Sequence, residues 1–200
     1  MMTQTPGKRV GWPQARIRGV SGARTMTDPV QEFIDKQALH ELVLRYCRAC
    51  DRRDFRQLRA LYHDDATDDH GSMFRGTADE YIAWLPGVMA NFEATVHSIT
   101  NSLFIVEGDA AQGEIYTVAY HRTHPPQAQD VLIGGRYLDH YERRGGTWKF
   151  KQRALALDWC RVTPVQEAAY REFAAGAPRG RTDHEDPSYL VLPYFRRGRC

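Results

Sequence analysis

The sequence predicts an α+β fold in which helices come first and a run of long antiparallel strands follows. Apolar residues recur at helical spacing between residues 29 and 51, whereas the segments after residue 94 are rich in β-branched and aromatic residues. A glycine pair, Gly145-Gly146, separates the last two of these segments and suits the two-residue turn of a hairpin. We therefore expect N-terminal helices packed on one face of a curved, mostly antiparallel sheet, with a cavity between them.

The first helix is expected to begin at Pro29, because Asp28 is a typical N-cap and proline is favoured at the first helical position. It should run to about residue 51 and be followed by a short helix and a polar loop that ends at His70. The sequence Thr77-Ala78-Asp79-Glu80 is a capping box, so a third helix should begin there and end near Pro86 or shortly beyond.

The four expected strands are Ala94–Val106, Glu114–Arg122, Val131–Arg143 and Thr147–Asp158. Folding the last two about the glycine pair makes an opposite-charge pair and an aromatic pair coincide in one register, and such cross-strand pairs stabilise a sheet. The residues expected to face each other are Arg144 and Thr147, Glu142 and Lys149, and Tyr141 and Phe150.

Charge divides the chain into a basic leader and a mildly acidic body. Residues 1–25 hold five basic and no acidic residues, so subtracting them from the formal net charge of +2 leaves −3 for the rest. We expect residues 1–27 to be a disordered leader, residues 28–165 to be the domain, and residues 166–200 to be a C-terminal helix and tail. Met26 begins a more ordinary N-terminus, so a misassigned start codon and a functional basic arm both stay open.

The composition argues against several classes of protein. No apolar run approaches the roughly 20 residues of a membrane span, and the acidic body has no electrostatic footprint for nucleic acid. The four cysteines are irregularly spaced and the basic N-terminus lacks the apolar segment of a secretory signal, so a disulfide framework is not expected. We expect a cytoplasmic protein with neither a membrane nor a nucleic-acid partner.

Asp51 and His97 are the strongest candidates for a catalytic pair. Asp51 continues the apolar line of the first helix, so its carboxylate should point inward and needs a partner. His97 lies in the middle of an apolar strand that is expected to pack on this helix. A carboxylate beside one imidazole nitrogen fixes the tautomer and makes the other nitrogen a better base. A satisfied core histidine and a helix-end aspartate are the alternative, and spacing alone leaves both readings open.

Several other polar and aromatic residues are candidates for the lining of a substrate pocket. Tyr46 borders the same apolar arc as Asp51, and Asn101 should share the strand face of His97. Two further tyrosines on the next strand are candidates, with core packing as the alternative: Tyr116 and Tyr120.

Two motifs suggest metal or redox chemistry only weakly. The motif Cys47-Arg-Ala-Cys50 lies within an apolar helical stripe and has no second cysteine pair, which favours core cysteines. The acidic, histidine-containing segment 63–70 is more typical of a solvated turn than of a cation site. We expect no metal and no cofactor.

Three segments carry a family resemblance: VLIGG with YERRGGTWKF, RYCRACDRRD, and TVHSITN. They resemble the SnoaL-like family of the nuclear transport factor 2-like superfamily, which includes hexachlorocyclohexane dehydrochlorinase, scytalone dehydratase and bile acid 7α-dehydratase. The resemblance spans roughly residues 30–165. It implies a cone-shaped α+β barrel, catalysis without a metal, a catalytic Asp at Asp51, a catalytic His at His97 and a pocket Arg at Arg153.

Two positions need comment within this resemblance. Where the dehydrochlorinase has a catalytic Lys, this chain has Tyr46, which resembles the dehydratase branch and argues against dehydrochlorination. Strict alternation places Arg153 on the same strand face as Lys149 and Lys151, which is typical of a solvent-facing residue. Only a β-bulge, or a pocket on the Lys149 side farther along the sheet, would bring Arg153 inside.

The sequence is thus interpreted as a cofactor-independent lyase or isomerase, similar to a dehydratase, that acts on a small hydrophobic cyclic substrate. His97, held by Asp51, would remove a proton, while Tyr46 and Arg153 would stabilise the oxyanion or leaving group. A homodimer or homotrimer is expected because such a sheet leaves one broad face uncovered. The alternative is a non-catalytic ligand-binding module or the small (β-type) subunit of a ring-hydroxylating dioxygenase, which has the same fold.

Overall fold

A computed structural model describes residues 28–195 of the chain. The leader expected at residues 1–27 lies outside these described residues. The helices are α1 (Pro29–Asp51), α2 (Phe55–Ala60), α3 (Ala78–Met89), α4 (Glu167–Phe173) and α5 (Pro187–Val191). The strands are β1 (Tyr62–Asp69), β2 (Arg75–Thr77), β3 (Phe92–Glu107), β4 (Ala110–Thr123), β5 (Gln129–Arg144) and β6 (Thr147–Pro164).

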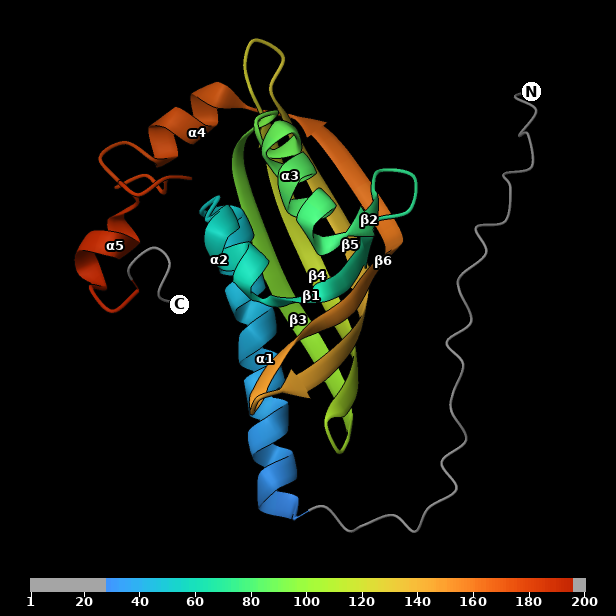
Figure 1. The fold of residues 1–200 in the computed structure, drawn as a ribbon. Coiled ribbons are helices and arrows are strands. Elements are labelled where there is room, and N and C mark those ends of the chain that lie inside the picture. The colour runs from blue at the N-terminus through green and yellow to red at the C-terminus, as the bar shows by residue number, and fades with distance from the viewer. Residues whose placement is uncertain (1–27, 196–200) are drawn as a thin grey trace, which may run out of the picture.

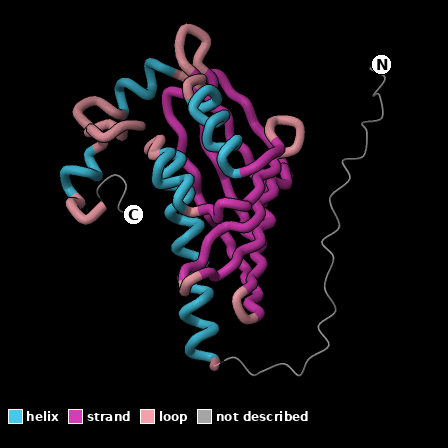
Figure 2. Tube along the Cα trace, in the orientation of Figure 1, coloured by secondary structure: helices cyan, strands magenta, loops and turns pink. Residues whose placement is uncertain are grey.

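The strands form one six-stranded sheet in the order β2-β1-β6-β5-β4-β3. Neighbouring strands are antiparallel except β1 and β6, which run parallel. The long strands curve together, α1 packs along β3, and α3 crosses the sheet on the same side (Figure 1). Figure 2 shows the strands as one continuous layer, with the helices packed against it or lying beside it. The sheet does not close on itself, so the fold is an open, cone-shaped α+β structure and the expected fold class is confirmed.

The core lies between α1, α3 and the inner face of the sheet. α1 begins at the expected place, since the Asp28 side chain accepts a hydrogen bond from the backbone N–H of Val30 at 3.0 Å. Among the buried side chains that α1 contributes are Leu39, Val43 and Tyr46, which are at most 1% exposed. None of the helices within residues 28–195 is long and apolar enough to cross a membrane.

The expected hairpin is confirmed in detail. Gly145 and Gly146 have φ values of 58° and 79°, the left-handed conformations that a two-residue hairpin turn of this type requires. The opposed residues are those expected: Arg144 and Thr147, Glu142 and Lys149, and Tyr141 and Phe150.

A bulge in β3 changes which residues of this strand face the core. The pairing with β4 shifts between Ile99 and Ser102, so the alternation reverses after the bulge. Phe104 is consequently buried, while Leu103 and Ile105 are 68% and 57% exposed. Strict alternation from His97 would have placed Leu103 and Ile105 on the inner face, and the bulge turns both outward.

The segment 63–70 is not the polar loop that its composition suggested. Most of it forms β1, which pairs with β6 and places Asp68 opposite Arg153. Asp68 is 1% exposed, so this aspartate is an interior residue and not part of a solvated turn. The sequence lacks apolar alternation here because two of the strand's buried residues, His63 and Asp68, are polar.

The C-terminal segment is tied to the last turns of α1. The guanidinium of Arg48 lies 5.1 Å from the centre of the Tyr189 ring and 5.3 Å from that of Phe195. Arg52 forms an ion pair with Asp186, and the two are 3.2 Å apart. α5 therefore lies to the side of the sheet, next to the C-terminal end of α1 (Figure 1).

The outer face of the sheet carries exposed apolar side chains. Trp159 is 48% exposed, and its indole lies flat on Gly134, where an added Cβ would come within 2.1 Å of the ring. Other exposed apolar residues of the strands on this face are Val96, Leu103, Ile105 and Tyr116. A contiguous apolar patch is unusual on a monomer.

Asp35 fastens α1 to the last hairpin. Its buried carboxylate accepts hydrogen bonds from Trp148 Nε1 at 2.9 Å and from Arg143 Nη1 at 2.8 Å. Arg143 also binds Asp109, whose side chain is 75% exposed. The same guanidinium thus has one buried and one exposed partner.

We predict that Asp35→Ala lowers the free energy of unfolding by about 2 kcal/mol, because it leaves the buried Trp148 N–H without an acceptor. Asp109→Ala is the matched control and should lower it by less than about 1 kcal/mol, since its ion pair is exposed. Urea denaturation measures both values. Equal losses would mean that Asp35 does not fasten the helix.

Candidate functional site

Asp51 and His97 are in contact. The Asp51 Oδ1 atom lies 2.7 Å from His97 Nδ1, and Asp51 Oδ2 accepts the backbone N–H of His97 at 3.0 Å. Asp51 is the last residue of α1, and Arg53, with φ 50°, turns the chain away immediately after it. The Asp51 and His97 side chains are 11% and 8% exposed, respectively. With Nδ1 occupied by the carboxylate, the free nitrogen of the His97 ring is Nε2.

His121 lies beside His97 and was not anticipated from the sequence. The two rings meet edge to face with their centres 5.5 Å apart, and Phe92 packs on His121 at 4.8 Å. His121 Nδ1 is buried and has no hydrogen-bond partner within the described residues. Burial, and then the nearby His97, lower the pKa of His121 from 6.5 to about 4, so its imidazole is neutral at pH 7.

Arg153 lies inside the cone, as the resemblance implied and simple alternation did not. The pairing of β5 and β6 shifts between His140 and Tyr141, because Lys151 is an extra residue on β6. The bulge brings Phe150 and Arg153 to the same face, and both are 0% exposed. The solvent-facing position that the pattern favoured is therefore wrong.

The Arg153 guanidinium is held by one carboxylate and three aromatic rings. Its Nε and Nη2 atoms donate to Asp139 at 2.8 Å and 2.7 Å. Its Cζ lies 4.0 Å from the ring centres of Tyr46 and Tyr137 and 4.2 Å from that of Phe150. Its Nη1 atom is buried without a hydrogen-bond partner in the described part of the chain. A donor therefore remains available in the interior.

Tyr46, whose ring lies against Arg153, is also hydrogen-bonded to the phenol of a second tyrosine. Its hydroxyl lies 2.8 Å from the hydroxyl of Tyr81, which comes from α3. Burial raises the pKa of both phenols well above 10, so both stay protonated. The hydrogen bond between the two hydroxyls uses one of their two protons, so the other proton lies outside this bond.

Three expected pocket residues do not face this interior. Asn101 is exposed at the β3 bulge, and the expectation that it shares the face of His97 is wrong. Ile115, Thr117, Ala119 and His121 are the inward residues of β4, each at most 8% exposed. Tyr116 and Tyr120 alternate with them and lie on the outer face, where Tyr116 is 42% exposed and the Tyr120 hydroxyl donates to Asp130 at 2.6 Å.

The alternation along β4 was the signal that could have identified His121, because a buried Ile115 fixes the inward parity of every second residue. Asp139 and Tyr81 could not be found in this way. Asp139 is recognisable only as the partner of Arg153, and that pairing depends on the bulge.

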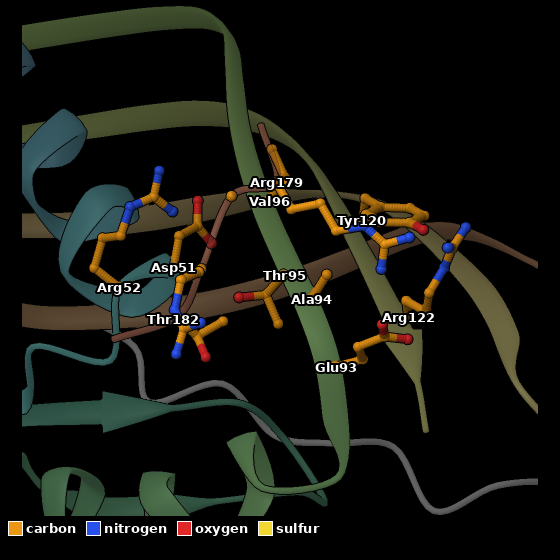
Figure 3. Close-up of a pocket in the computed structure, with 12 residues that line it drawn as sticks. Asp51, Arg52, Glu93, Ala94, Thr95, Val96, Tyr120, Arg122, Arg179 and Thr182 are labelled. Atoms are coloured by element: carbon orange, nitrogen blue, oxygen red, sulfur yellow. The ribbon is translucent and has the colours of Figure 1, made fainter. Parts of the chain in front are cut away.

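A cleft of about 360 Å³ lies next to Asp51 (Figure 3). Its walls are the start of β3, the outer side chains Tyr120 and Arg122 of β4, and the C-terminal segment at residues 179–182. Figure 3 shows Asp51 and Arg52 on one side of β3 and Tyr120 and Arg122 on the other. The cleft therefore wraps around the edge strand next to the candidate pair.

In the part of the chain that the structure describes, the cysteines and acidic residues form no candidate centre for metal or redox chemistry. Cys47 and Cys50 are buried, and burial raises the pKa of Cys47 to about 12, which keeps its thiol protonated. Within residues 28–195 no group of three or more His, Cys, Asp or Glu side chains is arranged to hold a metal ion.

Comparison with known proteins identifies the family. Residues 31–154 match the sequence model of the SnoaL-like domain. This match covers more than half of the chain, so the protein belongs to the SnoaL-like family. Uncharacterized proteins from Mycobacterium tuberculosis and Mycobacterium bovis are 25% identical over 126 residues, which are 62% of this chain and 86% of theirs.

Solved structures share the fold over about the same region. A Novosphingobium aromaticivorans protein, provisionally assigned as a scytalone dehydratase, is 25% identical over 68% of this chain and 93% of its own, with a TM-score of 0.61. A type 2 hexachlorocyclohexane dehydrochlorinase is 21% identical over 69% of this chain and 93% of its own, with a TM-score of 0.62. The second likeness concerns the fold alone.

We predict that His121 makes stability fall in acid. Its folded-state pKa of about 4 lies below the unfolded value of 6.5, so between these values only the unfolded chain takes up the proton. The stability that the neutral His121 contributes is fully present above about pH 6.5 and is lost as the pH falls to 4. The loss in the free energy of unfolding is on the order of 3 kcal/mol. Urea titrations of the native chain and of His121→Asn at pH 7 and pH 4 measure the difference. An identical loss in both proteins would contradict the assignment.

Proposed function

We propose that the protein is a cofactor-independent lyase or isomerase, similar to a dehydratase, in which Asp51 and His97 act as a proton-abstracting dyad. The observation that carries the proposal is the 2.7 Å contact between Asp51 Oδ1 and His97 Nδ1 at the edge of a buried polar interior. A carboxylate at Nδ1 fixes the imidazole tautomer and orients Nε2 for a substrate proton.

The remaining interior groups suit the stabilisation of a developing oxyanion. The Tyr46–Tyr81 pair has one hydroxyl proton outside its shared hydrogen bond, and Arg153 Nη1 is a buried donor with no hydrogen-bond partner within residues 28–195. Preorganised donors in a dry site stabilise negative charge far more strongly than they would in water. A neutral His121 beside the base adds a further hydrogen-bonding group and does not place a second positive charge next to His97.

The substrate class follows from the surroundings of these groups. Aromatic and aliphatic core residues of α1, α3 and the inner face of the sheet surround these groups. Such surroundings favour a small hydrophobic cyclic molecule with a carbonyl or hydroxyl group. The relative provisionally assigned as a scytalone dehydratase supports water loss as the reaction, in agreement with a tyrosine at position 46.

We predict that His97→Ala lowers turnover by roughly 10²–10⁴-fold, because the base is lost. Asp51→Asn should retain part of the activity, since a neutral acceptor can still orient the ring, and Tyr46→Phe should reduce activity less than loss of the base. The assay follows water loss or double-bond migration in hydroxylated and unsaturated cyclic ketones by absorbance. Phe173→Ala, an exposed residue of α4, is the control. Unchanged turnover of a converted substrate by His97→Ala would refute the mechanism, and conversion of no ketone would favour the ligand-binding alternative.

We also propose that the outer face of the sheet joins two or three copies of the chain. The apolar residues around Trp159 are the reason, because their burial removes a patch that is unfavourable in water. Arg136 on this face binds Glu114 at 2.7 Å and Asp158 at 3.0 Å, so charged residues accompany the patch, as at ordinary interfaces.

We predict a solution mass of two or three times the 22.9 kDa of the chain at micromolar concentration, measured by light scattering. Trp159→Glu should reduce the mass to that of a monomer, because the charge would be buried without a partner. Phe173→Glu replaces an exposed apolar residue that lies off the sheet and should leave the mass unchanged. A monomeric native chain would refute the interface.

A further inference from the structure

A second imidazole in the described residues pairs with a carboxylate in the same way as His97. His70 Nδ1 lies 2.5 Å from Asp68 Oδ1, and the Asp68 side chain is 0% exposed. Asp68 Oδ2 accepts the hydroxyl of Tyr62 at 2.7 Å. Within residues 28–195 no hydrogen bond reaches His70 Nε2, so the free nitrogen is the same one as in His97.

This second pair adjoins the polar interior already described. The His70 ring stacks on the ring of Tyr81, with centres 5.2 Å apart and an interplanar angle of 14°. The Tyr81 hydroxyl binds that of Tyr46, whose ring lies against Arg153. In the sheet, Asp68 stands opposite Arg153, and Arg153 stands opposite Asp139. A row of buried charges therefore crosses three strands and ends at His70.

The two pairs lie near opposite edges of the curved sheet. His97 belongs to the edge strand β3, and Asp68 belongs to β1, with β4, β5 and β6 between them. α3 spans the distance, because it begins directly after β2, the partner of β1, and ends before β3 (Figure 1). Its side chains Tyr81, Leu85 and Met89 are buried against the core.

The arrangement gives the buried Asp68 carboxylate two partners and leaves one imidazole nitrogen over. The hydroxyl of Tyr62 would need only an acceptor, which a carboxylate supplies without an imidazole. A fully buried carboxylate is unfavourable unless it has charged or hydrogen-bonding partners, and His70 is a partner with a second nitrogen to spare. The His70 side chain is 11% exposed.

We propose that Asp68 and His70 form a second proton-transfer pair of the same active site, in which His70 protonates the leaving oxygen. This proposal rests on the lyase function proposed above. His97 Nε2 takes the proton next to the carbonyl, and the electron pair of that C–H bond becomes the new C=C bond. The C–O bond breaks as its oxygen takes the proton from His70 Nε2, so water leaves. His97 then returns its proton to solvent, and His70 takes one up.

The test compares leaving groups that do and do not need a proton. The probes are 3-hydroxy-1-indanone, which must lose water, and 3-acetoxy-1-indanone, whose acetate leaves as a stable anion. His70→Gln should lower turnover of the hydroxy ketone by roughly 10²–10⁴-fold and that of the acetoxy ketone by less than about threefold. Asp68→Asn keeps an acceptor for Tyr62 and should show the same selective loss. His97→Gln should lower both rates, and His124→Gln, an exposed control, should lower neither. Equal effects of His70→Gln on the two probes would overturn the proposal and leave that for His97 intact.

A binding experiment separates the two proposals without turnover. Addition of the unreactive 1-indanone should shift the ring ¹⁵N signals of both His70 and His97 in NMR spectra of the full chain, with His124 as the unshifted reference. A shift of His97 alone would overturn the second pair and support the dyad. A shift of neither histidine would count against the proposed function and the second pair together.

Discussion

The burial of one cation organises the interior of this protein. Arg153 is 0% exposed, and a guanidinium removed from water is tolerated only with a carboxylate and good hydrogen-bond geometry. Asp139 provides both through two short bonds, and three aromatic faces replace the rest of the hydration shell. The bulge at Lys151 turns Arg153 inward. The inward tyrosines and the polar strand β1 then surround the Arg153–Asp139 pair.

The same burial defines the chemical character of the neighbouring groups. Desolvation keeps the phenols of Tyr46 and Tyr81 protonated and the imidazole of His121 neutral at pH 7. The interior therefore offers hydrogen-bond donors whose protonation states do not fluctuate near neutrality. Asp51 and His97 are in contact beside this region, with side chains that are 11% and 8% exposed.

Much of the fold and part of the candidate site could be predicted from the sequence. The helix start at Asp28, the glycine turn and the register of the last hairpin are local features, decided by capping, by φ and by cross-strand pairs. The Asp51–His97 contact was also foreseeable, since an aspartate on a buried helix face requires a partner on the element that packs there.

Tertiary structure decided the rest, because a β-bulge reverses strand parity and leaves no clear mark in composition. The bulge in β3 turned Asn101, Leu103 and Ile105 outward, and the bulge in β6 turned Arg153 inward. Likewise, the sequence predicts a loop around Asp68, and only the pairing of β1 with β6 places Asp68 in a strand. The sequence by itself determined which elements form and where the chain turns, since those preferences are local. Which polar side chains share the interior depends on register shifts between strands distant in sequence.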